Sequence, residues 1–163
     1  MVQRLDTFVM TTITLTPIGH VISSRDTTED DFWGDVEACI ELCPEFCAEV
    51  FEGIEDFSHV EVVLYFDRVA DEAIERGARH PRGNPAWPRV GIFAQRGKNR
   101  PNKLGVSVAR LVARKDRQLI LRGLDAINGT PVLDIKPVMR EFLPAGDIIQ
   151  PAWSQELMKH YWR

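Results

Sequence analysis

Short runs of β-forming residues recur along this chain of 163 residues, and this pattern limits the fold more than any other feature. The clearest are the apolar run at 59–66 (HVEVVLYF) and the alternating run at 105–112 (GVSVARLV). Such runs are typical of buried or half-buried strands. Seven or eight short strands with little helix predict a mainly β protein, a small single-domain β-barrel that is closed or nearly closed. The other expected strands cover residues 11–17 continuing to 22, 36–42, 90–93, 118–123 and 131–135.

Helical signals are few. The segment 44–54 has Pro near its start and Gly near its end, and 71–78 opens with acidic residues, which suits a helix dipole. The segment 154–162 begins with Ser and carries an apolar stripe. We therefore expect a barrel domain at 1–150 with short peripheral helices. A C-terminal helical tail at 151–163 is expected to pack on the barrel or on a partner chain.

Several functional classes are not supported. The sequence has no strand followed by a GxGxxG turn, no P-loop lysine motif and no apolar run of membrane-spanning length. The first fifteen residues carry an acid and no small-residue cleavage site, so we expect no signal peptide and a cytoplasmic protein. Cys39, Cys43 and Cys47 are spaced four apart, but Pro44 interrupts a helix there and no fourth ligand follows at a recognised spacing. We therefore expect no metal.

Charge divides the chain into opposed parts. Residues 76–115 contain no Asp or Glu and eleven Lys or Arg, whereas the first 75 residues hold eighteen acids and three bases. The net charge of −4 conceals this division. An unbroken positive field suits a polyanion such as RNA. Alternatively, the folded chain scatters these basic side chains over several faces.

Two loops of the basic run are candidates for contact with RNA. Residues 79–89 (RHPRGNPAWPR) are rich in Pro and contain Trp87, on which an unpaired base can stack. Residues 96–103 (RGKNRPNK) follow an apolar strand and carry four cations and two Asn, which suit phosphate or carboxylate. A solvated hairpin turn is the alternative for this second loop. The candidate RNA contacts are Arg79, Arg82, Lys98, Arg100, Asn102 and Lys103.

Three other clusters are open to more than one interpretation. Residues 124–137 (LDAINGTPVLDIKP) place polar groups at both ends of an apolar strand, which a plain hairpin also explains. Phe32 and Trp33 lie in an acidic loop, where they either favour a bound cation or cover the core. Ser58 and His59 are neighbours at a strand start, so we expect their side chains to point to opposite faces and to form no direct nucleophile–base pair.

Ordered motifs extend from about residue 17 to residue 142. They are Pro17-Ile18-Gly19, Ile40-Glu41-Leu42 with Pro44-Glu45-Phe46, Phe57-Ser58-His59, Gly91-Ile92-Phe93-Ala94, Arg100-Pro101-Asn102, Leu104-Gly105-Val106-Ser107, and Asn128-Gly129-Thr130-Pro131 with Asp134-Ile135-Lys136-Pro137. With these motifs the chain resembles the TsaA-like (YaeB-like, TrmO-type) family of tRNA N6-methyltransferases.

The resemblance implies a small barrel, usually a homodimer, that binds S-adenosylmethionine outside any Rossmann fold. It also implies methyl transfer to N6 of a threonylcarbamoyl-modified adenosine beside the anticodon of tRNA. Such a transfer depends mainly on positioning and needs no covalent nucleophile. No catalytic residue is assigned: Asp67 and Asp134 are candidate proton acceptors, and Lys136 is a candidate near the reaction site. By position, the cofactor contacts fall on Phe32, Trp33, Gly34, Phe66, Asp67, Arg96, Leu104, Asp125, Ala126, Ile127 and Asn128.

The sequence departs from the family pattern at several positions. Asn128 stands where the family has Asp, Val138 where it has Tyr, and Asp67 where a His often follows the strand. These departures motivate an alternative function, a regulatory or RNA-binding protein that binds S-adenosylmethionine without this methyl-transfer activity.

Overall fold

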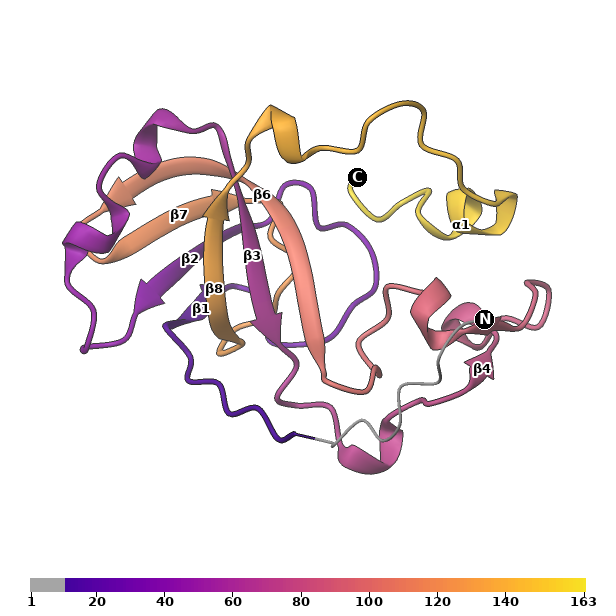
Figure 1. The fold of residues 1–163 in the computed structure, drawn as a ribbon. Coiled ribbons are helices and arrows are strands. Elements are labelled where there is room, and N and C mark those ends of the chain that lie inside the picture. Colours follow the sequence, from indigo (N-terminus) through magenta and orange to yellow (C-terminus); the bar gives the residue numbers. More distant parts are fainter. Residues whose placement is uncertain (1–10) are drawn as a thin grey trace, which may run out of the picture.

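The computed structural model describes residues 11–163 of the chain. Within these residues, six antiparallel strands close into a barrel in the order β1-β2-β7-β6-β3-β8, with β8 returning to β1 (Figure 1). The strands are β1 (Gly19–Ser23), β2 (Glu37–Leu42), β3 (His59–Tyr65), β6 (Leu104–Lys115), β7 (Gln118–Arg122) and β8 (Pro131–Pro137). The expected mainly β barrel is therefore confirmed. Two short strands, β4 (Ala78–Arg79) and β5 (Val90–Gly91), pair separately.

The barrel core follows from alternation along the strands. In β3, Val60, Val62 and Leu64 are at most 1% exposed, while the residues between them are partly exposed. Strand β6 points small residues inward at Gly105 and Ala109. Closure pairs every strand on both sides, so the barrel leaves no long free edge.

Two expected features at the N-terminal side differ from the structure. The alternating segment 11–17 contains no strand, and β1 begins at Gly19. Its sequence suits a strand, but the β1–β8 pairing stops at Gly19 and Val132 and does not extend back into this segment. The expectation of no signal peptide rests mostly on residues 1–10, which lie outside the described residues.

The helices are shorter than the sequence predicts. The segment 44–54 holds only two 3-10 turns, η1 (Ala48–Phe51) and η2 (Ile54–Asp56), because Gly53 adopts φ of +78° between them. The segment 71–78 forms only η3 (Asp71–Ala73), and the C-terminal helix α1 covers Ala152–Leu157 rather than 154–162. The remaining 3-10 turns are η4 (Pro81–Gly83), η5 (Ile92–Ala94) and η6 (Arg140–Phe142).

The strand directions gather three connections at one end of the barrel. Because every neighbouring pair is antiparallel, the β1–β2 connection (24–36), the β3–β6 connection (66–103) and the β7–β8 connection (123–130) share that end. We call it the loop end. Figure 1 shows the C-terminal tail on the same side of the barrel as the long β3–β6 connection. In the part of the chain described, no helix has the length and apolar character to cross a membrane.

Candidate functional site

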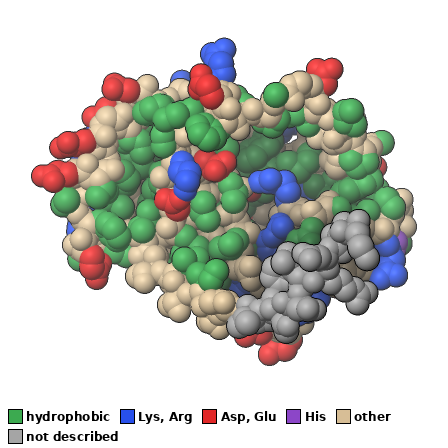
Figure 2. Space-filling view, in the orientation of Figure 1, with side chains coloured by type: hydrophobic (Ala, Val, Ile, Leu, Met, Phe, Trp, Pro, Cys, Tyr) green, Lys and Arg blue, Asp and Glu red, His purple; other side chains and the backbone are tan. Residues whose placement is uncertain are grey.

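The loop end brings together the residues that were predicted to contact the cofactor. Phe32, Trp33 and Gly34 lie on the β1–β2 connection, and 125–128 lie on the β7–β8 connection. The remaining four lie along the β3–β6 connection or at its junction with β6: Phe66, Asp67, Arg96 and Leu104. Figure 2 shows a hollow on this side, between the barrel and the outlying loops, with Lys and Arg side chains at its border. Segments far apart in sequence therefore form one candidate site.

Arg68 fixes two of these connections to each other. Its guanidinium donates to the carbonyl oxygens of Asp26 at 3.0 Å and Asn128 at 2.8 Å. The Asn128 side-chain oxygen also accepts from the Ser23 N–H at 3.3 Å, an acceptor role that Asp fills equally well. Sequence reasoning missed Arg68 because its partners are 42 and 60 positions away.

Trp33 and Phe32 have different surroundings. Trp33 is 4% exposed, and the Arg25 guanidinium lies 4.2 Å from its ring centroid. Arg25 also donates to the Phe32 carbonyl at 2.9 Å, so this cation is held within the loop. The face of Trp33 thus already carries a cation of the protein itself. Phe32 adopts φ of +65° and is 57% exposed, and its ring stacks with that of His160 in the tail at a centroid distance of 6.3 Å.

The C-terminal tail docks on this same loop. The N–H groups of Phe32 and Trp33 donate to the carbonyls of His160 at 3.1 Å and Tyr161 at 2.8 Å. Gly34 permits the contact, because a Cβ there would lie 1.9 Å from the Trp162 carbonyl oxygen. Tyr161 then reaches the β7–β8 connection and donates its hydroxyl to Asp125 Oδ2 at 2.5 Å. Together with a hydrogen bond from Trp87 to Glu156, these contacts join the tail to all three segments that form the candidate site.

Arg96 and Phe66 are also held by neighbours. Arg96 donates to the Val106 carbonyl at 2.6 Å, which fixes one end of its guanidinium. The Phe66 ring lies over Gly105, where a Cβ would approach the ring to 2.5 Å. Leu104 is half-buried beside it and Asp67 is exposed. Of these residues, Arg96 and Asp67 keep polar groups that can meet a ligand.

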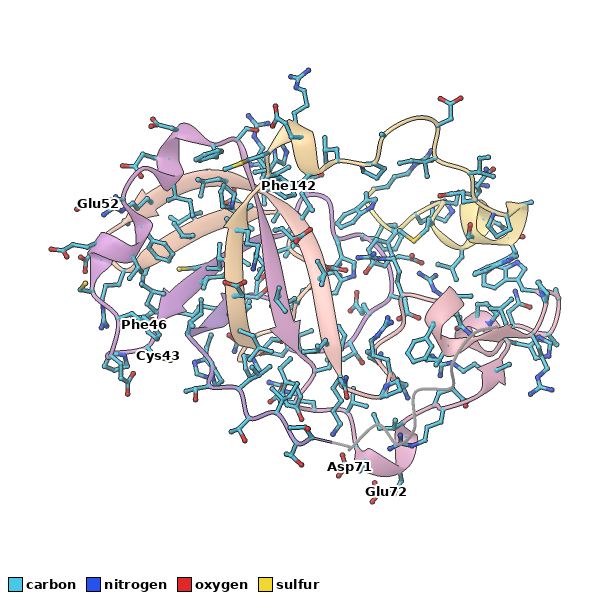
Figure 3. The ribbon with its side chains drawn as sticks, in the orientation of Figure 1. Cys43, Phe46, Glu52, Asp71, Glu72 and Phe142 are labelled. Carbon is cyan, nitrogen blue, oxygen red and sulfur yellow. The ribbon has the colours of Figure 1, made fainter. Side chains whose placement is uncertain are left out.

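Part of the basic run is neutralised by acids from the other half of the chain. Arg82 pairs with Asp31 at 2.8 Å, and Lys103 pairs with Asp71 at 2.6 Å. These hydrogen bonds hold the pKa of Arg82 and of Lys103 above their ordinary values. Figure 3 shows Asp71 on the outer turn of the β3–β6 connection. The opposed charges of the sequence are therefore partly matched inside the fold.

The other candidate RNA contacts lie in the same connection with varied exposure. Arg100 donates to the Gln95 carbonyl at 3.3 Å, and the Nε of Arg79 is buried without a hydrogen-bond partner among the described residues. Lys98 is half-buried and Asn102 is exposed. Trp87 donates its indole N–H to Glu156 of the tail at 2.8 Å, so its edge is held rather than free.

The candidate catalytic residues are not all brought together. Asp67 lies at the loop end, directly after β3. Asp134 and Lys136 lie along β8 and form an ion pair with each other. Asp134 lines a cavity of about 200 Å³ with Ile18, Phe46 and Ile54, which belong to the opposite side of the barrel.

The cysteines lie away from the loop end. Figure 3 shows Cys43 and Phe46 at the end of the barrel remote from the tail. Burial raises the pKa of the Cys39 thiol, which disfavours a reactive thiolate. Among residues 11–163, no group of three or more His, Cys, Asp or Glu side chains is arranged to hold a metal ion.

The expectation for Ser58 and His59 was wrong. Ser58 Oγ lies 2.8 Å from His59 Nδ1, a hydrogen-bonding distance. Because β3 begins at His59, Ser58 lies outside the regular strand and need not point to the opposite face. The pair is exposed and lies at the start of strand β3, whereas the loop end follows the last residue of that strand.

Comparison with known proteins gives a consistent result. Residues 28–142 match the model of the tRNA-methyltransferase O N-terminal domain. The chain belongs to this family. It is 39% identical over 109 residues to a probable S-adenosyl-L-methionine-binding protein of Pyrococcus abyssi, covering 66% of this chain and 55% of that protein. It is 36% identical over 104 residues to the tRNA (adenine(37)-N6)-methyltransferase of Escherichia coli, covering 60% of this chain and 43% of that one.

The fold matches a member of the tRNA-methyltransferase O family as well. The crystal structure of TrmO from P. aeruginosa superposes with a TM-score of 0.72 and 30% sequence identity, over 90% of this chain and 64% of that chain. The chain thus spans about half the length of the curated relatives it matches. The family model ends at residue 142, so the docked tail lies beyond the matched domain.

The Gly34 contact gives a direct test of tail docking. We expect Gly34→Ala to displace the tail, because the new Cβ would overlap the Trp162 carbonyl. Limited proteolysis, read by mass spectrometry, should then cut within 143–163 faster than in the wild type. Gly91→Ala is the matched control, since a Cβ there meets nothing within 4 Å. Equal cleavage of the wild type and the Gly34 variant would contradict the docked arrangement.

Proposed function

We propose that this chain is an S-adenosylmethionine-dependent methyltransferase that acts on N6 of a threonylcarbamoyl-modified adenosine next to the tRNA anticodon. The observation that carries the proposal is the convergence at one barrel end of three connections that hold the predicted cofactor residues. The names of the relatives agree with it, since they describe S-adenosyl-L-methionine binding and tRNA adenine N6 methylation.

The side chains at the loop end suit the chemical groups of the proposed donor. Phe32 offers an exposed aromatic face for an adenine ring. The carboxylates of Asp125 and Asp67 can bind the hydroxyls or the positive charge of the donor. Arg96 keeps N–H groups that can bind the donor's carboxylate. When bound, S-adenosylmethionine supplies an electrophilic methyl group on a positively charged sulfur.

The protein's part in such a reaction is positioning. The acceptor nitrogen must lie in line with the methyl–sulfur bond, which rigid loops accomplish by holding both substrates. Arg68 and Arg25 provide this rigidity through their bonds to backbone carbonyls. The acceptor nitrogen must also lose a proton, and Asp67 is the candidate acceptor at the loop end. Asp134 and Lys136 stay candidates on β8, where they neutralise each other.

We propose that tRNA lies across the β3–β6 connection. Arg79, Lys98, Arg100 and Asn102 are the contacts expected there, and Arg82 and Lys103 join them by exchanging a carboxylate partner for a phosphate. Each of these two cations then has an anionic partner both in the free protein and in the complex with tRNA. A tRNA substrate also supports the proposed cytoplasmic location.

We further propose a homodimer. The outward side of β6 exposes a row of valines: Val106 at 42%, Val108 at 46% and Val112 at 49%. Figure 2 shows hydrophobic side chains over much of the barrel face that β8, β3 and β6 form in Figure 1. An apolar face of this kind is typical of a surface that a second chain covers.

The proposed activity is tested by incubating the protein with labelled S-adenosylmethionine and tRNA from a strain that lacks its own enzyme. We expect label in the tRNA, and mass spectrometry of its nucleosides should locate the methyl group on the threonylcarbamoyl adenosine. Tight donor binding without transfer would instead favour the regulatory or RNA-binding alternative. Absence of both binding and transfer would remove the proposal.

Arg96 gives a test of the donor site. We expect Arg96→Ala to weaken binding of S-adenosylhomocysteine roughly tenfold, the loss typical of one hydrogen bond to a charged group. Titration calorimetry measures the affinity, and thermal unfolding checks that the fold is intact. Arg110→Ala is the control. This exposed arginine lies opposite His59 in the β3–β6 strand register, at the end of the barrel away from the loop end. An unchanged affinity would place Arg96 outside the donor site.

Arg100 gives a test of the RNA surface. We expect Arg100→Ala to weaken tRNA binding and to make the plot of log affinity against log salt shallower by roughly 0.7–0.9, the effect of one phosphate contact. Filter binding at several salt concentrations measures the slope. Lys115→Ala is the control, since this exposed base belongs to the same basic run but lies at the far end of β6. An unaltered slope in the Arg100 variant would mean that Arg100 does not face the RNA.

A further inference from the structure

The C-terminal tail reaches the candidate site although it lies outside the matched family domain. Two backbone hydrogen bonds, from Phe32 and Trp33 to the carbonyls of His160 and Tyr161, place it along the β1–β2 connection. The absence of a side chain at Gly34 lets the backbones approach this closely. A segment so placed is positioned to act on whatever the loop end binds.

Tyr161 makes a side-chain hydrogen bond between the tail and the β7–β8 connection. Its hydroxyl donates to Asp125 Oδ2 at 2.5 Å and is partly buried. Burial first, and then the charge of Asp125, raise the pKa of the Tyr161 phenol well above its ordinary value. The phenol therefore stays protonated and acts as a donor at physiological pH. Because a carboxylate accepts at both oxygens, this bond leaves Asp125 Oδ1 able to meet a ligand.

The surroundings of Tyr161 link the two predicted binding functions. Arg96 is a predicted contact of the methyl donor, and Arg82 is a predicted RNA contact. The positive charges of both favour the ionised form of the Tyr161 phenol. Arg82 is in turn paired with Asp31, next to Phe32. The tail also touches the basic loop, where Glu156 accepts from the Trp87 indole at 2.8 Å. Tyr161 thus lies near residues that were predicted for both binding functions.

We infer that Tyr161 is a positioning residue of the methyl-donor site: it orients the Asp125 carboxylate toward the donor's hydroxyl or cationic groups, so the tail completes the site. This inference rests on the proposed function. A carboxylate without such a partner rotates freely and must be ordered when the ligand binds, which weakens affinity. A protonated phenol fixes the orientation of the Asp125 carboxylate before the ligand binds, and it leaves the second carboxylate oxygen, Oδ1, free to accept from the ligand.

The test uses the full-length Tyr161→Phe variant, which keeps the ring and removes the hydroxyl. We expect S-adenosylhomocysteine to bind roughly tenfold more weakly, as for the loss of one hydrogen bond to a charged group. In turnover, KM for the donor should rise while KM for tRNA stays unchanged. Lys159→Ala, an exposed change in the same tail, is the control and should alter neither value.

A double-mutant cycle with Asp125→Ala, which removes the acceptor of the Tyr161 hydrogen bond, separates positioning from general support of the fold. If Tyr161 acts through Asp125, adding Tyr161→Phe to the Asp125 variant should cause little further loss of affinity. Equal losses in both backgrounds, or no loss in the wild-type background, would overturn the inference while leaving donor binding by the wild type intact. A wild type that binds no donor would remove the proposed function and the inference with it. If Tyr161→Phe does not fold, Asp125→Ala alone decides, because unchanged affinity for S-adenosylhomocysteine in that variant overturns the inference.

Discussion

Antiparallel closure of the barrel is the constraint on which the rest of the structure depends. Once six strands alternate in direction around a closed sheet, each connection has one end at which it can emerge. The connections 24–36, 66–103 and 123–130 must then meet, although up to about a hundred residues separate them along the chain. The strands carry a small buried core, and the variable chemistry is left to the loops, as is typical of scaffolds that hold a binding site.

Electrostatic matching then orients charged side chains of the loops at this end of the barrel. The acidic part of the chain and the basic run adjoin in sequence, but their paired residues do not: Arg82 meets Asp31 across 51 positions and Lys103 meets Asp71 across 32. Exposed pairs of this kind contribute little stability, about 0–1 kcal/mol each. Their value lies in orientation, because they hold cationic side chains at the loop end in defined positions. Since a phosphate can replace a carboxylate at little cost in charge pairing, the same residues remain suited to RNA.

Much of the barrel could be predicted from sequence because its signal is local. The segments 59–66, 105–112 and 118–123 match β3, β6 and β7 closely, since side-chain alternation reports a half-buried strand directly. The segment 11–17 has the same signal but forms no strand, which the local pattern does not reveal. The helices were overestimated because Gly53 interrupts the segment 44–54, and the backbone becomes extended at Ile74 although the composition of 71–78 favours helix.

The candidate site was only partly predictable. The resemblance located its loops, but Arg25, Arg68 and Tyr161 act through partners that no spacing rule connects. In the sequence Tyr161 stood out only as part of an apolar stripe. Such a stripe does not indicate that its hydroxyl forms a hydrogen bond with Asp125, 36 positions earlier. Long-range contacts between side chains and loop backbones depend on the completed fold, which is why local patterns miss them.

Backbone strain marks the same region independently. Four described residues other than Gly have positive φ, and three of them lie in the loop-end connections: Phe32 at 65°, Arg82 at 50° and Lys103 at 52°. A left-handed conformation costs a residue with a side chain roughly 1–3 kcal/mol, so neighbouring contacts must impose it. Each of the three also makes a contact with a residue distant in sequence: Phe32 with the tail carbonyl of His160, Arg82 with Asp31, and Lys103 with Asp71. The strained residues of the loop end are therefore also residues that match charge or dock the tail, as expected where geometry serves binding rather than stability.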